Sequence, residues 1–322
     1  MVPDKPEASF DRERRRLLLF AGIAGTALTL PASGAGRESS GPGITESHPS
    51  ASGARPISTS LDTRDPEQNL RVYMKVLSDL DDRPTFRFHT GRILSVAPGQ
   101  LGEPLLDFVA CKQDRVRQLA DGSYQHGYRG VILFTDIDTG QVLDTFANPL
   151  TGKTNRVQHF RTSWGSGIYS AQGRYSLGAG ASELQNASAL RTKPFQLAWS
   201  IVRDDVWITY DERVVVRSAS GSVQYADSSM YRYHTSLRQL LDPGQTSADA
   251  IMSWGTETSW WPWMEMGGRP GHLLFGSMGR KYPDLSSVPG DVIAAAERLF
   301  PGQLTEPIDW AALAPRAPGL NR

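Results

Sequence analysis

From Thr85 onward the sequence alternates between apolar and more polar residues, and turn-forming residues separate the runs. The run from Phe195 to Ile201 is typical, because every second residue in it is large and apolar. A period of two places successive side chains on opposite faces of a strand, so one face of each strand is predicted to be buried. No helix-length pattern lies between the strands, which argues against a parallel sheet with crossover helices and against dinucleotide-binding or P-loop folds. Antiparallel hairpins are the expected connections.

The predicted fold class is therefore mainly β, with one large antiparallel sheet. We expect the sheet to be a closed or nearly closed, calycin-like barrel, because closure removes exposed strand edges. The run from Val131 to Phe134 is apolar at every position and predicts a central strand. Helical spacing from Leu70 to Leu77 predicts one short N-terminal helix, and Val292 to Leu299 predicts a C-terminal one that ends before Pro301.

The first residues carry the pattern of an export signal. Arg14-Arg15-Arg16-Leu17-Leu18 is followed by an apolar run to Leu30 and by small residues up to Ala35. We expect residues 1–35 to be a twin-arginine-type signal peptide that engages the twin-arginine export machinery, with an ordinary secretory signal as the alternative. The apolar run is too short for a stable membrane span. Both routes predict an exported protein, periplasmic or extracellular.

The rest of the chain divides by composition. Residues 36–64 are rich in Gly, Ser, Thr and Pro and predict a disordered linker, because they offer little apolar surface to bury. Residues 65–322 are expected to form a single β-rich domain.

Charge and cysteine content exclude several classes of protein. The chain has 34 basic and 34 acidic residues without a basic block, so we expect no nucleic-acid partner. Cys111 is the single cysteine, which excludes an internal disulfide and predicts a small buried hydrophobe. No paired-histidine or paired-cysteine motif is present, and we expect neither a metal nor another cofactor.

A segment rich in tryptophan and methionine is the densest unusual feature. Such side chains adapt to irregular apolar ligands, so we expect the segment to wall a pocket together with two of the predicted strands. The alternative is that its side chains fill the barrel or hold the C-terminal helix. A sugar-stacking surface is a further, weaker alternative. The predicted ligand-binding residues are Phe134, Trp199, Trp254, Trp260, Trp261, Trp263 and Met264.

His159 is the best candidate for acid–base chemistry. We expect it in a strand from Thr154 to Arg161, facing inward because it shares a face with Val157. Asp136 could then orient it, and Glu257, which follows Trp254 closely, is an alternative acid. A hydrogen-bonded structural histidine is the alternative reading of His159.

Three strings of residues resemble an uncharacterised exported family, the domain-of-unknown-function family 1838. They are DIDTGQVL at residues 136–143, NPLTGK at 148–153 and WPWMEMG at 261–267. The resemblance spans roughly Leu70 to Tyr282 and implies the domain boundaries and export, but no catalytic residues.

Three functions remain open at this stage. The first is an exported protein that binds a small, largely apolar organic molecule. The second is a non-redox enzyme, such as a hydratase, isomerase or hydrolase, that uses His159 with a carboxylate. The third is an interaction protein of the cell envelope, which would expose its tryptophans as a patch.

Overall fold

The computed structural model describes residues 61–173, 175–177, 194–217, 223–311 and 313. The predicted signal peptide and most of the predicted linker therefore lie outside the described residues. Ten strands form one antiparallel sheet in the order β7-β6-β3-β2-β1-β12-β11-β10-β9-β8. The bounds of these strands are β1 Thr85–Val96, β2 Glu103–Gln118, β3 Tyr124–Thr135, β6 Phe160–Tyr169, β7 Tyr175–Leu177, β8 Ala198–Val202, β9 Asp205–Arg217, β10 Val223–Ser236, β11 Ile251–Thr258 and β12 His272–Tyr282.

The remaining elements are short. A two-stranded sheet pairs β4 with β5. Their bounds, with those of the helices, are β4 Thr145–Asn148, β5 Lys153–Arg156, α2 Pro66–Leu77, α3 Leu237–Leu241, the 3-10 turns η1 Pro262–Met264 and η2 Leu285–Ser287, and α4 Gly290–Leu299. The mainly β class, the large antiparallel sheet and the two predicted helices are thus confirmed.

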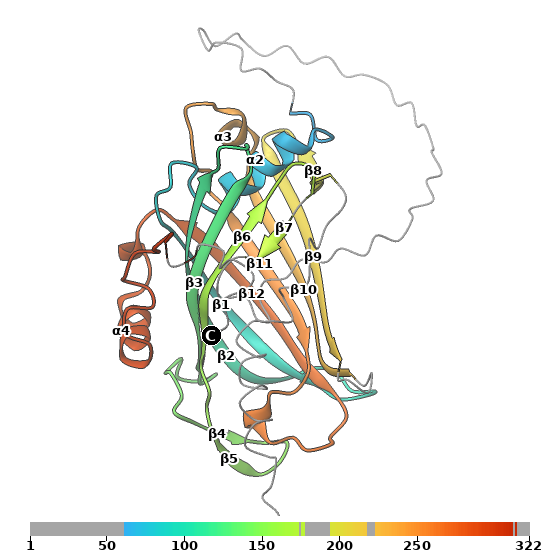
Figure 1. Ribbon diagram of the computed structural model, residues 1–322. Coiled ribbons are helices and arrows are strands. Elements are labelled where there is room, and N and C mark those ends of the chain that lie inside the picture. The colour runs from blue at the N-terminus through green and yellow to red at the C-terminus, as the bar shows by residue number, and fades with distance from the viewer. Residues whose placement is uncertain (1–60, 174, 178–193, 218–222, 312, 314–322) are drawn as a thin grey trace, which may run out of the picture.

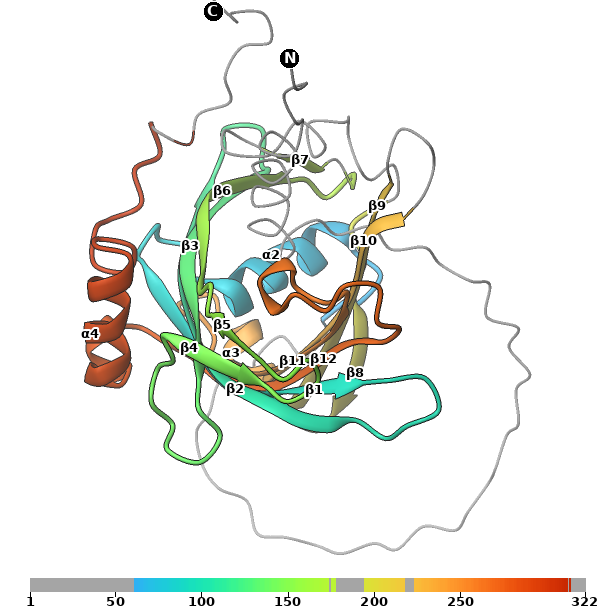
Figure 2. The ribbon, with the colours of Figure 1, turned by 90° about the horizontal axis from the view of Figure 1, so that it is seen from below.

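The large sheet curls around a concave face, and α2 lies inside the curl (Figures 1 and 2). Asp65 caps the start of α2 by accepting a hydrogen bond from the backbone N–H of Glu67, and Pro66 occupies the first turn. Its residues from Asn69 to Leu77 are buried except Arg71, because the sheet surrounds most of the helix.

The predicted closure of the sheet is not found, because β7 and β8 are edges that do not pair with each other. The backbone N–H of Phe195 donates to Ala171 O at 2.9 Å, which links the segments beside the two edges. Beyond that link, Asn69 Oδ1 accepts from the backbone N–H of Leu197 at 3.0 Å and from Trp199 Nε1 at 2.6 Å. The helix thus accepts from the backbone just before the edge strand β8 and from an indole on that strand.

Two apolar clusters fill the concave side. The upper cluster surrounds α2 and includes Tyr73, Val116, Ile208, Tyr233 and Met252. The lower cluster surrounds η1 and includes Phe108, Phe134, Trp261, Trp263 and Met264. A cavity lies between the two clusters on the concave face.

The convex side of the sheet is covered by the C-terminal part of the chain. Val292 and Ala296 of α4 pack with Cys111 and Val131, which are buried on β2 and β3 (Figure 1). The burial of Cys111 confirms its predicted structural place.

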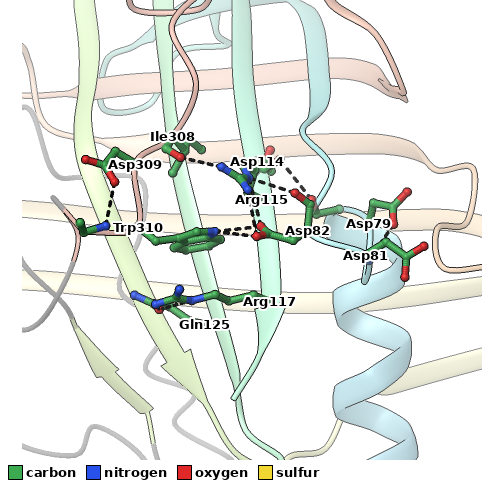
Figure 3. A network of polar contacts seen from close by, with 12 residues as sticks. Asp79, Asp81, Asp82, Asp114, Arg115, Arg117, Gln125, Ile308, Asp309 and Trp310 are labelled. Atoms are coloured by element: carbon green, nitrogen blue, oxygen red, sulfur yellow. Dashed lines mark hydrogen bonds and ion pairs between the residues drawn. The ribbon is translucent and has the colours of Figure 1, made fainter. Parts of the chain in front are cut away.

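The segment after α4 is held by polar contacts. Trp310 Nε1 donates to both carboxylate oxygens of Asp82 at 2.9 Å, and Arg115 Nη1 donates to Ile308 O at 2.6 Å (Figure 3). Arg115 also contacts the Asp82 carboxylate at 2.9 Å. One carboxylate and one guanidinium therefore fix the end of the described chain to the sheet.

Candidate functional site

The three residues predicted for acid–base chemistry lie in separate environments. His159 lies between β5 and β6, so the strand predicted from Thr154 to Arg161 is wrong at its centre. His159 Nδ1 accepts a hydrogen bond of 3.1 Å from the backbone N–H of Phe134, and burial lowers the pKa of the imidazole. This contact ties the ring to a core strand.

Neither predicted carboxylate is joined to His159 by a contact among the described residues. The carboxylate of Asp136 accepts hydrogen bonds of 2.8 Å from the backbone N–H and the hydroxyl of Thr139, which closes its own turn. Glu257 is exposed on β11 and lies 3.6 Å from His272 Nε2.

Most of the predicted ligand-binding aromatics are packed in the lower cluster. The ring centroids of Phe134 and Trp261 lie 4.7 Å apart, and those of Trp261 and Trp263 lie 5.7 Å apart. Met264 has no exposed surface. The packing matches the alternative in which this segment fills the interior, because its side chains contact one another and the strands.

Three other predicted tryptophans have different surroundings. Trp199 donates from Nε1 to Asn69 of α2 and packs against the upper cluster. Trp260 is partly exposed and donates from Nε1 to Arg269 O at 3.1 Å. Trp254 on β11 lies against the lower cluster and lines a cavity.

That cavity measures about 90 Å³ and lies on the concave face between the two clusters. A single ordered water needs roughly 10–15 Å³, so the space holds several waters or one small organic molecule. Ala110 and Ile132 face Tyr231, Met252 and Trp254 across it. Its wall is thus largely apolar and aromatic.

A buried polar cluster lies beside the cavity. Arg87, which lines the cavity, donates from Nε and Nη2 to the two oxygens of Asp114 at 2.6 and 2.5 Å. His126 Nε2 lies 2.7 Å from Asp114 Oδ1. Asp114 has no exposed surface, and burial by itself would raise its pKa. The charge of Arg87, the hydrogen bond with His126 and the charge of Lys112 together outweigh burial and hold the pKa well below its usual range. Asp114 is therefore a paired carboxylate rather than a free acid, while Nδ1 of His126 is buried with no hydrogen-bond partner among the described residues.

His89 is the polar residue of β1 that reaches the cavity without such a partner. Among the described residues its Nδ1 is buried with no hydrogen-bond partner. Burial lowers the pKa of His89 to about 3, and the charge of Arg87 adds to the shift. The imidazole is therefore neutral at neutral pH.

Arg87, His89 and Asp114 are not among the site residues predicted from the sequence, although a signal for them is present. Arg87 and His89 share one face of β1 with Ile93, and Asp114 shares one face of β2 with Phe108. Charged residues on the apolar face of two adjacent strands indicate a buried polar site, because burial of an unpaired charge is unfavourable.

Neither a metal-binding cluster nor a membrane-spanning helix is found in the part of the chain that the structure describes. Over the described ranges, no group of three His, Cys, Asp or Glu side chains is placed to hold a metal ion. No helix in that part of the chain combines the length and the apolar character needed to cross a membrane.

Comparison with curated proteins finds no match. The model of a family described as a protein of unknown function, DUF1838, matches residues 82–310. This range begins at Asp82 and ends at Trp310. It contains all twelve strands of the described residues and the whole lining of the cavity. The match confirms the resemblance carried by the three sequence strings, and the chain belongs to the DUF1838 family.

Proposed function

We propose that this protein binds a small, largely apolar organic molecule in the cavity on the concave face of its sheet. The observation that carries the proposal is the cavity of about 90 Å³ lined by Ala110, Ile132, Tyr231, Met252 and Trp254. Protein interiors are otherwise packed closely, and a concave apolar site with few polar groups is typical of small-molecule binding.

The proposed site differs from the one expected from the sequence. The ligand would contact Trp254, which lines the cavity. The side chains of Trp261, Trp263 and Met264 would pack in the lower cluster and would not contact the ligand. In this proposal the curled sheet and α2 together enclose the guest as a nearly closed, calycin-like barrel would.

The protonation states and hydrogen-bond partners of the ionisable groups near the cavity support a binding protein rather than an enzyme. A general base acts best when its pKa is near the working pH, and the pKa of His89 is about 3. Asp114 is occupied by Arg87 and His126. His159, the base of the enzyme alternative, accepts from the Phe134 backbone and lies outside the cavity lining.

Mass spectrometry of small molecules extracted from natively purified protein tests the proposal. We expect one organic compound to co-purify with the wild-type protein and to be lost from Ala110→Phe, because the phenyl ring would fill the cavity. Thr90→Phe introduces the same phenyl ring at an exposed position of β1, and this variant should retain the compound. An empty wild-type protein after exposure to native extracts would reject the proposal.

Tryptophan fluorescence provides a second readout. Addition of the extracted compound should change the emission of the wild-type protein and of Trp207→Phe, because Trp207 is exposed on β9, away from the cavity lining. The response should be lost in Trp254→Phe. A response that survives in Trp254→Phe places the compound elsewhere.

We also propose that the protein is exported by the twin-arginine route. The support is the pattern Arg14-Arg15-Arg16-Leu17-Leu18 followed by a short apolar run. Replacement of both Arg14 and Arg15 by Lys should retain the full-length chain in the cytoplasm. Cell fractionation checks this, and unchanged export of the double variant would favour the ordinary secretory signal.

A further inference from the structure

His89 is placed on the inner face of β1. Its neighbours in the register are Ala110 on β2 and Gly279 on β12, and both positions face the concave side. A Cβ atom at Gly279 would lie 2.7 Å from His89 Nδ1, so the glycine makes room for the ring. The imidazole therefore lies over the backbone of β12 at Gly279, and the residue also lines the cavity.

The two ring nitrogens of His89 differ in environment. Nδ1 lies beside the space that a Cβ at Gly279 would take, and it is fully buried. Nε2 is not among the fully buried unpartnered atoms, and no hydrogen bond to it is found among the described residues. Since the residue lines the cavity, Nε2 is the atom that a guest can reach.

The opposite wall of the cavity is aromatic. The rings of Tyr231 on β10 and Trp254 on β11 are nearly parallel, with an interplanar angle of 8° and centroids 6.4 Å apart. Trp254 also makes an edge contact with Phe108, at 5.9 Å between centroids, which fixes its orientation. A flat ring fits such a wall better than a branched aliphatic chain does.

We propose that the guest of this cavity is an aromatic molecule that carries a hydroxyl group, and that His89 selects it by hydrogen bonding through Nε2. The inference rests on the proposed function and names its ligand class. A hydroxyl both donates and accepts, so it satisfies Nε2 in either tautomer of the neutral ring. Of the three guanidinium nitrogens of Arg87, the cation next to His89 on β1, two are already held by Asp114.

Two probes of equal shape test the inference on the intact protein. p-Cresol and p-xylene differ by one hydroxyl in place of one methyl group, and calorimetric titration gives their dissociation constants. Wild-type protein should bind both and should prefer p-cresol. In His89→Leu the ratio of the two constants should shift toward p-xylene by roughly tenfold, because the buried hydroxyl then lacks a partner.

A conservative variant separates selection from structure. His89→Gln keeps a polar group at the same position and should restore most of the preference for p-cresol, whereas a merely structural loss would weaken both probes equally in both variants. An unchanged ratio in His89→Leu overturns the inference and leaves the proposed function standing. Failure of wild-type protein to bind either probe overturns the inference, while the extraction experiment decides the proposed function separately.

Discussion

Lys281 Nζ donates a hydrogen bond of 2.6 Å to the backbone carbonyl of Lys75, in the last turn of α2. It also donates to Ser78 O at 3.0 Å and to Ser247 Oγ at 2.9 Å. Lys75 Nζ in turn donates to the carbonyl of Leu240 at 3.1 Å, near the end of α3. Two buried lysines thus satisfy helix carbonyls and hold α2 above the cavity.

We expect Lys281→Met to lower the free energy of unfolding by about 2–3 kcal/mol. The substitution removes three hydrogen bonds from a charged donor, and the carbonyls of Lys75 and Ser78 keep only those from Ala248 N–H and Ser247 Oγ. Urea denaturation measures the change. Lys153→Met is the control, because Lys153 pairs with Glu265 at the surface and such pairs contribute less than about 1 kcal/mol. Equal effects of the two substitutions would contradict the capping role.

Two arginine–aspartate pairs join β1 to β2. One pair is buried in the interior and the other is exposed to solvent. Arg87 and Asp114 are buried, whereas Arg92 and Asp107 meet at 2.7 Å in solvent. Asp114→Asn should cost about 3–5 kcal/mol, because it leaves the Arg87 charge buried and uncompensated. Asp107→Asn should cost less than about 1 kcal/mol. Chemical denaturation of both variants checks the difference, and a small effect at Asp114 would reject the buried network.

The sequence predicts the strands and helices well where a local pattern decides the structure. The spacing of Leu70, Tyr73, Met74 and Leu77 predicts α2, and the unbroken apolar run from Val131 predicts a buried central strand. In these two segments the apolar side chains whose spacing predicts the helix or strand are also the side chains that are buried in the core.

Closure and the site depend on contacts between distant segments, which periodicity does not reveal. Asn69 is a single polar residue in a helical pattern, and nothing local in the sequence indicates that its side-chain oxygen accepts the backbone N–H of Leu197 beside an edge strand. The indoles of Trp261 and Trp263 are equally compatible with a pocket wall and a core, and only their packing on Phe134 distinguishes the two.

Acid should destabilise the protein partly through His89. Unfolded histidine takes up a proton near pH 6.5, whereas the folded ring stays neutral to about pH 3. Between these values the unfolded state binds more protons, so the free energy of unfolding falls as the pH decreases. The loss between pH 7 and pH 4 should be smaller in His89→Leu by about 1–3 kcal/mol. Denaturation at both pH values checks this, and equal losses would show that His89 is protonated in the folded state.

The anchor of the C-terminal segment can be released without unfolding the sheet. Asp82 has φ 59°, so Asp82→Gly removes the carboxylate while it tolerates the backbone conformation. The variant loses both hydrogen bonds from Trp310, and residues 302–311 should be cut faster by a protease. Asp81→Gly is the neighbouring control and should be cut at the wild-type rate. Equal protection of both variants would show that other contacts hold the segment.

Two glycines next to each other in the sheet should respond in opposite ways to the same substitution. Gly91 faces the concave side of β1, where a Cβ would lie 2.4 Å from Gly276 O and 2.7 Å from Phe108 Cε1. Gly91→Ala should therefore cost about 1–3 kcal/mol, because backbone and a packed ring must move. A Cβ at Gly276 meets no atom within 4 Å, so Gly276→Ala should be neutral or stabilising by up to about 1 kcal/mol. Thermal unfolding of the two variants measures the difference. An unchanged stability of Gly91→Ala would mean that the backbone of β12 and the ring of Phe108 do not pack against Gly91 as closely as these distances indicate.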